Sequence, residues 1–127
     1  MIRAYPKQES RATARRRKRR IEREVIRAAR ATVVTRDGYC RLWTATATWH
    51  DDGCWGPSEW AHLIPRSLTR GRPPRERHGS DKTLMLCRRH HQALDEHRLT
   101  IQCGPRGARE RVSFRWAGDV AARWSDK

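Results

Sequence analysis

Residues 87–95 read Cys87-Arg88-Arg89-His90-His91-Gln92-Ala93-Leu94-Asp95, and they place two pairs of potential metal ligands on one predicted helix. Each helical residue turns the chain by about 100°, so residues three or four apart share a face. Cys87 and His90 therefore share one face, and His91 and Asp95 share another. This divergence predicts two sites: a thiolate and imidazole clip that suits zinc, and an imidazole and carboxylate pair that suits a harder catalytic cation.

The composition describes one small domain with a thin hydrophobic core. Of the 127 residues, 34% are charged and 36% are hydrophobic, and there is a single Phe. Domains of this kind usually need a metal ion or disulfides for stability. The 4 Cys and 6 His residues offer either solution. The four cysteines are Cys40, Cys54, Cys87 and Cys103. If they form disulfides, they pair in one of three possible ways.

The N-terminal residues 1–6 contain no apolar run, and no stretch is long enough to span a membrane. We therefore expect neither a signal peptide nor a membrane anchor, and we expect the protein in the cytoplasm. In such a reducing compartment, cysteines bind metal more often than they form disulfides. The metal alternative is accordingly favoured.

The net charge of +15 is concentrated near the N-terminus. Residues 1–31 carry twelve Lys or Arg and three Glu, so +9 lies in a quarter of the chain. A basic segment on a basic domain is typical of nucleic-acid-binding proteins. An acidic membrane surface is the alternative partner, but the segment lacks the bulky apolar face and aromatic residues of interfacial helices.

This basic segment is predicted to be helical, with Ser10 as N-cap and a helix to about residue 34. Apolar residues at helical spacing in its later half would pack on the domain, and the basic half would project. We predict that six consecutive cations contact DNA phosphates; the alternative is a solvated or localisation-type tail. The six are Arg15, Arg16, Arg17, Lys18, Arg19 and Arg20.

The remaining chain alternates short strand and turn patterns around the predicted metal helix. We expect a turn at 36–39, strands at 40–43, 44–53 and 59–64, a surface loop at 66–80, the metal-bearing helix with its lead-in at 83–97, and a closing hairpin of 99–103 and 112–116. His78 in the loop and His97 have no assigned role: each could contact DNA or the catalytic ion, and the default expectation is that each faces solvent. Cys103 is expected to be a free thiol.

Two segments in this order resemble the HNH endonucleases, in particular the small phage and prophage type. One is Ala61-His62-Leu63-Ile64-Pro65-Arg66-Ser67, and the other is Leu86-Cys87-Arg88-Arg89-His90-His91 followed by Asp95. The resemblance covers roughly residues 36–116. It implies an α+β protein: a small zinc-stapled ββα-metal domain at 36–116, preceded by a long basic N-terminal helix (1–35) and followed, after the β-hairpin, by a tail (117–127).

The resemblance also implies roles for individual residues. His62 matches the family's general base, and an imidazole with a pKa near 6.5 suits that task at neutral pH. His91 and Asp95 match the helix ligands of a catalytic divalent cation such as Mg²⁺ or Mn²⁺. Arg66 would clamp a phosphate.

Two positions depart from the family pattern. Ala61 stands where the family often has a metal-binding Asp or His, and Glu59, on the same strand face, is our substitute ligand. Lys82 stands where the family has an Asn that ties the loop around the catalytic His. That change leaves the orientation of His62 open.

The same family often carries a structural zinc ion. The ligands implied here form a Cys₃His set, with His50 competing with Cys54 for one place. The alternative is that Cys40 and Cys54 are small buried hydrophobic residues. The predicted zinc ligands are Cys40, Cys54, Cys87 and His90.

The leading prediction is thus a divalent-metal-dependent endonuclease that hydrolyses phosphodiester bonds of double-stranded DNA. The alternative is a catalytically degenerate, zinc-stabilised DNA-binding module, which the changes at Ala61 and Lys82 favour. One site cuts one strand at a time, so double-strand cleavage would need a homodimer or successive events. The resemblance suggests a phage or prophage protein that acts in a bacterial host cell beside the packaging machinery.

Overall fold

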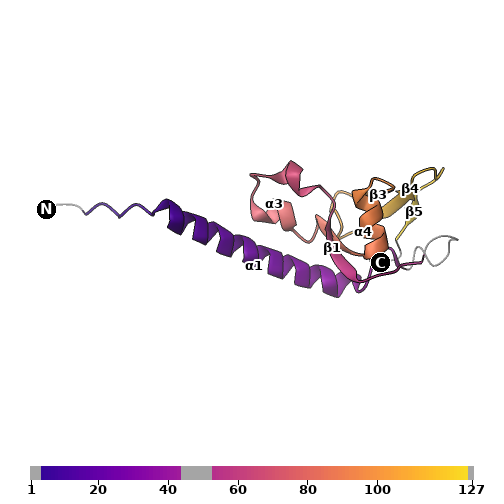
Figure 1. The fold of residues 1–127 in the computed structure, drawn as a ribbon, viewed down its shortest axis with the longest axis horizontal. Coiled ribbons are helices and arrows are strands. Elements are labelled where there is room, and N and C mark those ends of the chain that lie inside the picture. Colours follow the sequence, from indigo (N-terminus) through magenta and orange to yellow (C-terminus); the bar gives the residue numbers. More distant parts are fainter. Residues whose placement is uncertain (1–3, 44–52, 126–127) are drawn as a thin grey trace.

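The computed structural model describes residues 4–43 and 53–125, as one long helix attached to a compact part of two small sheets and short helices (Figure 1). The predicted α+β class is confirmed. The elements are α1 (Arg11–Asp37), β1 (Ser58–His62), the 3₁₀ helix η1 (Arg66–Thr69), α3 (Pro74–His78), β2 (Thr83–Cys87), α4 (Arg88–Asp95), β3 (Leu99–Gln102), β4 (Ser113–Trp116) and β5 (Arg123–Trp124).

Helix α1 begins at the predicted N-cap, where the Ser10 hydroxyl accepts a hydrogen bond from the Thr13 N–H at 3.1 Å. It ends at Gly38, whose φ of 68° lies in the region that glycine tolerates, and whose N–H reaches the Val34 carbonyl at 3.0 Å. The turn that we predicted at 36–39 therefore begins at residue 38, two residues later than expected. The basic half of α1 projects away from the compact part (Figure 1).

A buried ion-pair network fixes the C-terminal end of α1. The Asp37 carboxylate is buried and accepts hydrogen bonds from Arg36, Arg41 and the Met85 N–H. Arg41, also buried, reaches the Ala108 carbonyl at 2.7 Å. Because buried charges persist only when they are paired, this network ties α1 to β2 and to the C-terminal region.

The hairpin of the domain consists of β1 and β2, which pair antiparallel with Ser58 opposite Cys87 and His62 opposite Thr83. Our prediction of a helix lead-in at 83–87 was therefore wrong. All five residues of β2 are buried, and a short apolar run buried on both faces forms a strand more readily than an amphipathic helix. The predicted strand at 40–43 is a turn, with the Trp43 N–H bonded to the Cys40 carbonyl at 3.1 Å. The predicted strand at 44–53 lies outside the described residues except for its last one.

The segment 66–80, predicted as a surface loop, contains η1 and α3. Pro74 occupies the first turn of α3, where its missing N–H has no cost. Helix α3 packs on α1. This packing buries His78 completely, so the expectation that His78 faces solvent was wrong.

The predicted closing hairpin is confirmed by the antiparallel pairing of β3 with β4, where Leu99 lies opposite Trp116. A third strand, β5, pairs with β4 through Ser113 and Trp124. Strands β3 and β4 lie in the predicted domain (36–116), and β5 lies in the segment predicted as the tail (117–127). The hydrophobic core lies between this sheet, α4 and the hairpin, and includes Leu42, Ala61, Leu84, Leu86, Ala93, Leu99, Val112 and Phe114. No helix in the described part of the chain has the length and apolar character needed to cross a bilayer.

Candidate functional site

The four predicted zinc ligands come together at the start of α4. Their ligand atoms all lie within 4.8 Å of one another. His90 Nδ1 is 3.6 Å from the Cys40 Sγ, 3.5 Å from the Cys54 Sγ and 3.0 Å from the Cys87 Sγ. All cysteines are free thiols, so the disulfide alternative is not realised, and the predicted grouping of Cys40, Cys54, Cys87 and His90 is confirmed.

Two of these distances, to the Cys40 and Cys54 sulfurs, match a tetrahedral zinc site, and the distance to the Cys87 Sγ is shorter. Zn–S bonds of about 2.3 Å and Zn–N bonds of about 2.0–2.1 Å at tetrahedral angles place sulfur and nitrogen roughly 3.6 Å apart. The cluster is also enclosed, since Cys40, Cys87 and His90 have no exposed surface. A closed Cys₃His set with no open position is typical of structural zinc rather than catalytic zinc.

The environment of the cluster favours a bound cation in two further ways. A hydrogen bond from Cys40, the largest cause, together with those from His90, lowers the pKa of the Cys87 thiol, and the thiolate is the form that binds metal. The second nitrogen of His90, Nε2, is buried without a hydrogen-bond partner among the described residues, so Nδ1, which faces the three sulfurs, is the ring nitrogen placed to bind a metal ion.

Helix α4 separates its two histidines as the spacing predicted. His90 is buried in the cysteine cluster, whereas the adjacent His91 has a side chain that is 26% exposed on a different face. The hydrophobic Ala93 anchors the inner face of α4 in the core. One turn of α4 thus contributes His90 to the buried cysteine cluster and His91 to a solvent-accessible site.

A second cluster brings together the three residues predicted to hold the catalytic cation. His91 Nδ1 is 3.1 Å from a Glu59 carboxylate oxygen, and His91 Nε2 is 3.7 Å from an Asp95 carboxylate oxygen. The carboxylates therefore flank opposite nitrogens of the ring. As the side chains lie, Glu59 and His91 can offer ligand atoms to one point, and Asp95 is placed to orient the ring from the other side.

His62 lies at the end of β1, on the opposite strand face from Glu59. Its ring packs against Trp60, with ring centroids 4.6 Å apart, and its Nε2 is 2.9 Å from His78 Nδ1. Burial, the largest cause, and the positive charges of nearby groups lower the pKa of His62 to about 4. The imidazole is consequently neutral at physiological pH, the form that accepts a proton.

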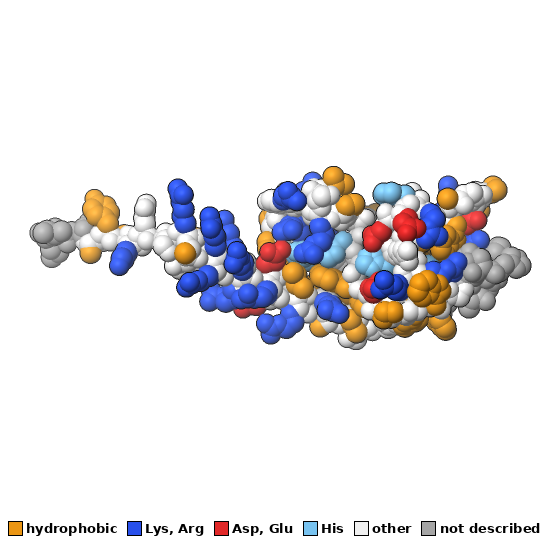
Figure 2. All heavy atoms as spheres, in the orientation of Figure 1, with side chains coloured by type: hydrophobic (Ala, Val, Ile, Leu, Met, Phe, Trp, Pro, Cys, Tyr) orange, Lys and Arg blue, Asp and Glu red, His pale blue; other side chains and the backbone are white. Residues whose placement is uncertain are grey.

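The His62 and His91 clusters act on each other through their charges. His91 is close enough for its charge to help lower the pKa of His62, as does Arg66. Histidine and acidic side chains gather on one face of the compact part (Figure 2). The side chain of Arg66 is exposed, so it is free to meet a phosphate.

Sequence reasoning missed a third group of residues beside His62. His78 Nε2 is 2.9 Å from a carboxylate oxygen of Glu22, and Arg77 reaches the same oxygen at 3.0 Å. The available signal was the position of Glu22, which is next to Ile21 and three before Val25 on the apolar stripe of α1. A carboxylate on the packing face of a helix calls for a buried partner.

The predicted DNA-contacting cations lie on the projecting part of α1, where all six are exposed: Arg15, Arg16, Arg17, Lys18, Arg19 and Arg20. Figure 2 shows lysine and arginine side chains over most of this helix. Arg17 pairs with Glu9 at 3.1 Å. The others present charge to the solvent without such a partner in the described part of the chain.

Three predictions remain, on His97, Cys103 and His50, and the structure gives an outcome for the first two. His97 is exposed as expected, with a φ of 60°. Cys103 is half-buried, and burial raises the pKa of its thiol. His50, the competing zinc ligand, lies outside the described residues.

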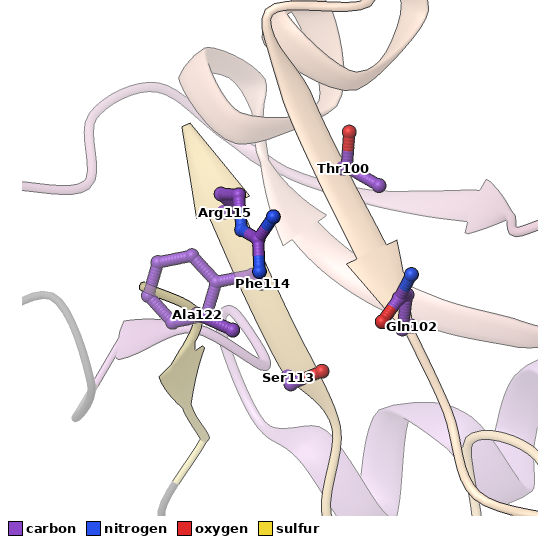
Figure 3. A pocket seen from close by; sticks show the side chains of 6 residues that line it. All are labelled: Thr100, Gln102, Ser113, Phe114, Arg115 and Ala122. Atoms are coloured by element: carbon purple, nitrogen blue, oxygen red, sulfur yellow. The ribbon is translucent and has the colours of Figure 1, made fainter. Parts of the chain in front are cut away.

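A small cavity of about 90 Å³ lies on the C-terminal sheet, away from these clusters. Figure 3 shows the side chains that line it, and none of them is a predicted site residue: Thr100, Gln102, Ser113, Phe114, Arg115 and Ala122. It holds no titratable pair or metal-ligand group, so it contributes nothing to the candidate site.

Comparison with known proteins gives one result. No curated protein and no solved structure matches the chain. Residues 40–102 match the family model described as HNH endonuclease. The match contains the cysteine cluster, the Glu59–His91 cluster and His62, and it leaves out α1. Over residues 40–102 the chain therefore belongs to the HNH endonuclease family, whose members are typically DNA phosphodiester hydrolases.

Proposed function

We propose that the protein is a divalent-metal-dependent endonuclease that hydrolyses phosphodiester bonds of double-stranded DNA. The observation that carries the proposal is the pairing of a neutral, partly exposed His62 with an adjacent Glu59–His91 cluster. An imidazole that accepts a proton beside a carboxylate and imidazole pair is the arrangement that metal-assisted hydrolysis requires.

In this mechanism, His62 removes a proton from the water that attacks phosphorus, and the bond from phosphorus to one ester oxygen breaks. Glu59 and His91 would hold the divalent cation, with Asp95 orienting His91 or completing the ligand set. The cation would supply charge stabilisation at the phosphate and the leaving oxygen. Arg66 would donate hydrogen bonds to a phosphate oxygen.

The test is an incubation of the protein with supercoiled plasmid and Mg²⁺ or Mn²⁺, beside a sample with a chelator. We expect metal-dependent conversion to open-circular DNA, because one such centre per chain cuts one strand at a time. Linear product at early times would instead indicate two chains acting together in a homodimer. Absence of any cleavage with either metal would favour the alternative, a zinc-stabilised DNA-binding module, which Ala61 and Lys82 support.

We also propose a phage or prophage origin, action in the cytoplasm of a bacterial host, and work beside the packaging machinery. These proposals rest on the resemblance to small phage nucleases. Purification from an infected host, with copurification of packaging proteins, would test them.

The exposed cations of α1 predict a strong salt dependence of DNA binding. Each phosphate neutralised contributes about 0.9 to the slope of log affinity against log salt. Replacing three of these cations with Gln preserves helix propensity. If each cation neutralises one phosphate, the magnitude of the slope should fall by about 0.9 for each cation removed. The variant is Arg16→Gln, Arg19→Gln and Arg20→Gln.

The matched control removes the same charge from the other end of the molecule, by Gln at three exposed positions: Arg106, Arg109 and Arg115. Binding isotherms at several salt concentrations measure both slopes. Equal slopes for the two triple variants would show that α1 makes no phosphate contacts of its own.

The low pKa of His62 predicts an unusual pH profile of activity. A general base works in its neutral form, so its rate falls only as the pH drops through its pKa. With a pKa of about 4 for His62, the cleavage rate should be flat from about pH 8 to pH 5. A general base with the ordinary imidazole pKa of about 6.5 would instead make the rate fall as the pH drops below about 6.5. Single-turnover cleavage at saturating Mn²⁺ measures this profile. An acid limb near 6.5 would contradict the assignment.

A further inference from the structure

A chain of hydrogen bonds runs from the N-terminal helix to the imidazole assigned as general base. Glu22 of α1 contacts His78 Nε2 at 2.9 Å, and His78 Nδ1 contacts His62 Nε2 at 2.9 Å. His78 has no exposed surface, whereas the side chain of His62 is partly exposed. The first residue of this hydrogen-bond relay, Glu22, lies outside residues 40–102, the part of the protein that matches the HNH endonuclease family.

We propose that Glu22 and His78 are positioning residues that fix the tautomer and orientation of His62, so that His62 Nδ1 is the atom that accepts the proton of the attacking water. This inference rests on the proposed nuclease function for its consequence in catalysis. The tautomer of His62 can be measured without an activity assay.

The direction of the hydrogen bonds follows from the groups involved. An ionised carboxylate only accepts hydrogen bonds, so His78 must donate from Nε2 to Glu22. When His78 carries one ring proton, as an ordinary imidazole does at about pH 8, its Nδ1 is bare and accepts, and His62 donates to it from Nε2. The remaining nitrogen of His62, Nδ1, is left with its lone pair. A carboxylate that fixes the tautomer of a catalytic imidazole in this way is a known catalytic device.

The surroundings keep Glu22 ionised. The hydrogen bond from His78 is the largest cause that lowers the pKa of the Glu22 carboxyl, and the Arg77 charge at 3.0 Å acts in the same direction. The side chain of Glu22 remains 31% exposed. Solvent contact and two donors together make this carboxylate a stable acceptor for His78.

The same residues do not form a metal site. His78 uses one ring nitrogen toward His62 and the other toward Glu22, so the ligand atoms do not converge on a point. The cluster that does converge, among the described residues, is the cysteine set around His90. A relay of hydrogen bonds is therefore the arrangement that the geometry supports.

The first experiment measures the tautomer of His62 directly, from the side-chain ¹⁵N shifts of the full-length zinc-loaded protein at about pH 8, where an ordinary imidazole is neutral. His62→Gln assigns the signals. We expect the Nε2–H tautomer for His62, and we expect Glu22→Leu, which removes the acceptor for His78 Nε2, to shift this population toward Nδ1–H. An Nδ1–H tautomer in the wild type, or no response to Glu22→Leu, would overturn the inference even if the protein cleaves DNA.

The second experiment compares cleavage by Glu22→Leu and Glu24→Leu. Both remove one carboxylate acceptor and one negative charge from α1, but Glu24 is exposed. We expect Glu22→Leu to lower kcat by about 10- to 100-fold, the usual loss when an orienting group is removed, with KM for DNA equal to that of Glu24→Leu. Equal kcat values would overturn the inference. If the wild type cleaves nothing, the proposed function fails, and the tautomer measurement still decides the relay.

Discussion

Replacing His62 with alanine is expected to lower kcat for plasmid nicking by about 10²- to 10⁴-fold, the usual contribution of a general base. The water would then have to lose its proton to solvent while the cation and Arg66 still hold the phosphate. KM for DNA should change little, because His62 is one partly exposed side chain beside a strongly basic surface. Rates of conversion of supercoiled to open-circular plasmid measure the effect.

The control for this experiment is His97→Ala, which removes an exposed imidazole that contacts none of the site residues. It should cleave as the wild type does. Zinc content and thermal unfolding show whether His62→Ala remains folded, and added imidazole should restore part of its rate if a base is what was lost. Equal cleavage by His62→Ala and the wild type would assign the reaction to a contaminant or to another base, and would remove His62 from the mechanism.

The separation of His90 from His91 and Asp95 was predictable from helical geometry, because adjacent residues of a helix point in different directions and residues four apart share a face. Cys87 lies just before the helix, as the last residue of β2 and the N-cap of α4. Its Sγ meets His90 through the cap, where it accepts a hydrogen bond from the His90 N–H at 3.4 Å. The N-cap at Ser10 was predictable for a similar reason, since a capping side chain and the N–H it accepts are close in sequence.

The strand at 83–87 was not predictable from periodicity alone. Leu84, Met85 and Leu86 are buried together because β2 has β1 on one edge and core on both faces. Nothing local distinguishes such a run from the lead-in of a helix. Conversely, the turn at 40–43 looks apolar because Cys40 and Leu42 are drawn into the core beside the metal-ligand cluster, which overrides their strand preference.

The orientation of His62 was open in the sequence because its partner is distant in sequence. His78 lies sixteen residues away and Glu22 lies on α1, fifty-six residues before His78. Only the packing of α3 on α1 brings these groups into line. Pairings of this kind have no periodic signature, so a lone histidine in an Arg-, Gly- and Pro-rich segment resembles a solvent-exposed one until the fold is known.

Loss of the cysteine cluster is expected to unfold the domain. Structural zinc contributes about 10–16 kcal/mol of apparent binding free energy in small zinc-dependent folds, and whole domains of this size are stable by only about 5–15 kcal/mol. The core of this protein is thin, and the cluster joins the turn at Cys40, the segment at Cys54 and the start of α4. Cys87→Ser should therefore lose zinc and show no cooperative thermal unfolding transition under conditions in which the wild type is folded.

The matched control is Cys103→Ser, a half-buried free thiol outside the cluster, which should keep its zinc and its unfolding temperature. Metal analysis of the metal-replete wild type should give one zinc ion per chain, and a strong chelator should reproduce the Cys87→Ser phenotype. Because His91 directly follows the zinc ligand His90 on α4, a stoichiometry below one, or a folded and zinc-free Cys87→Ser, would mean that hydrophobic burial alone positions α4. The Glu59–His91 pair would then have to be held in place by the hairpin and the core without help from a metal ion.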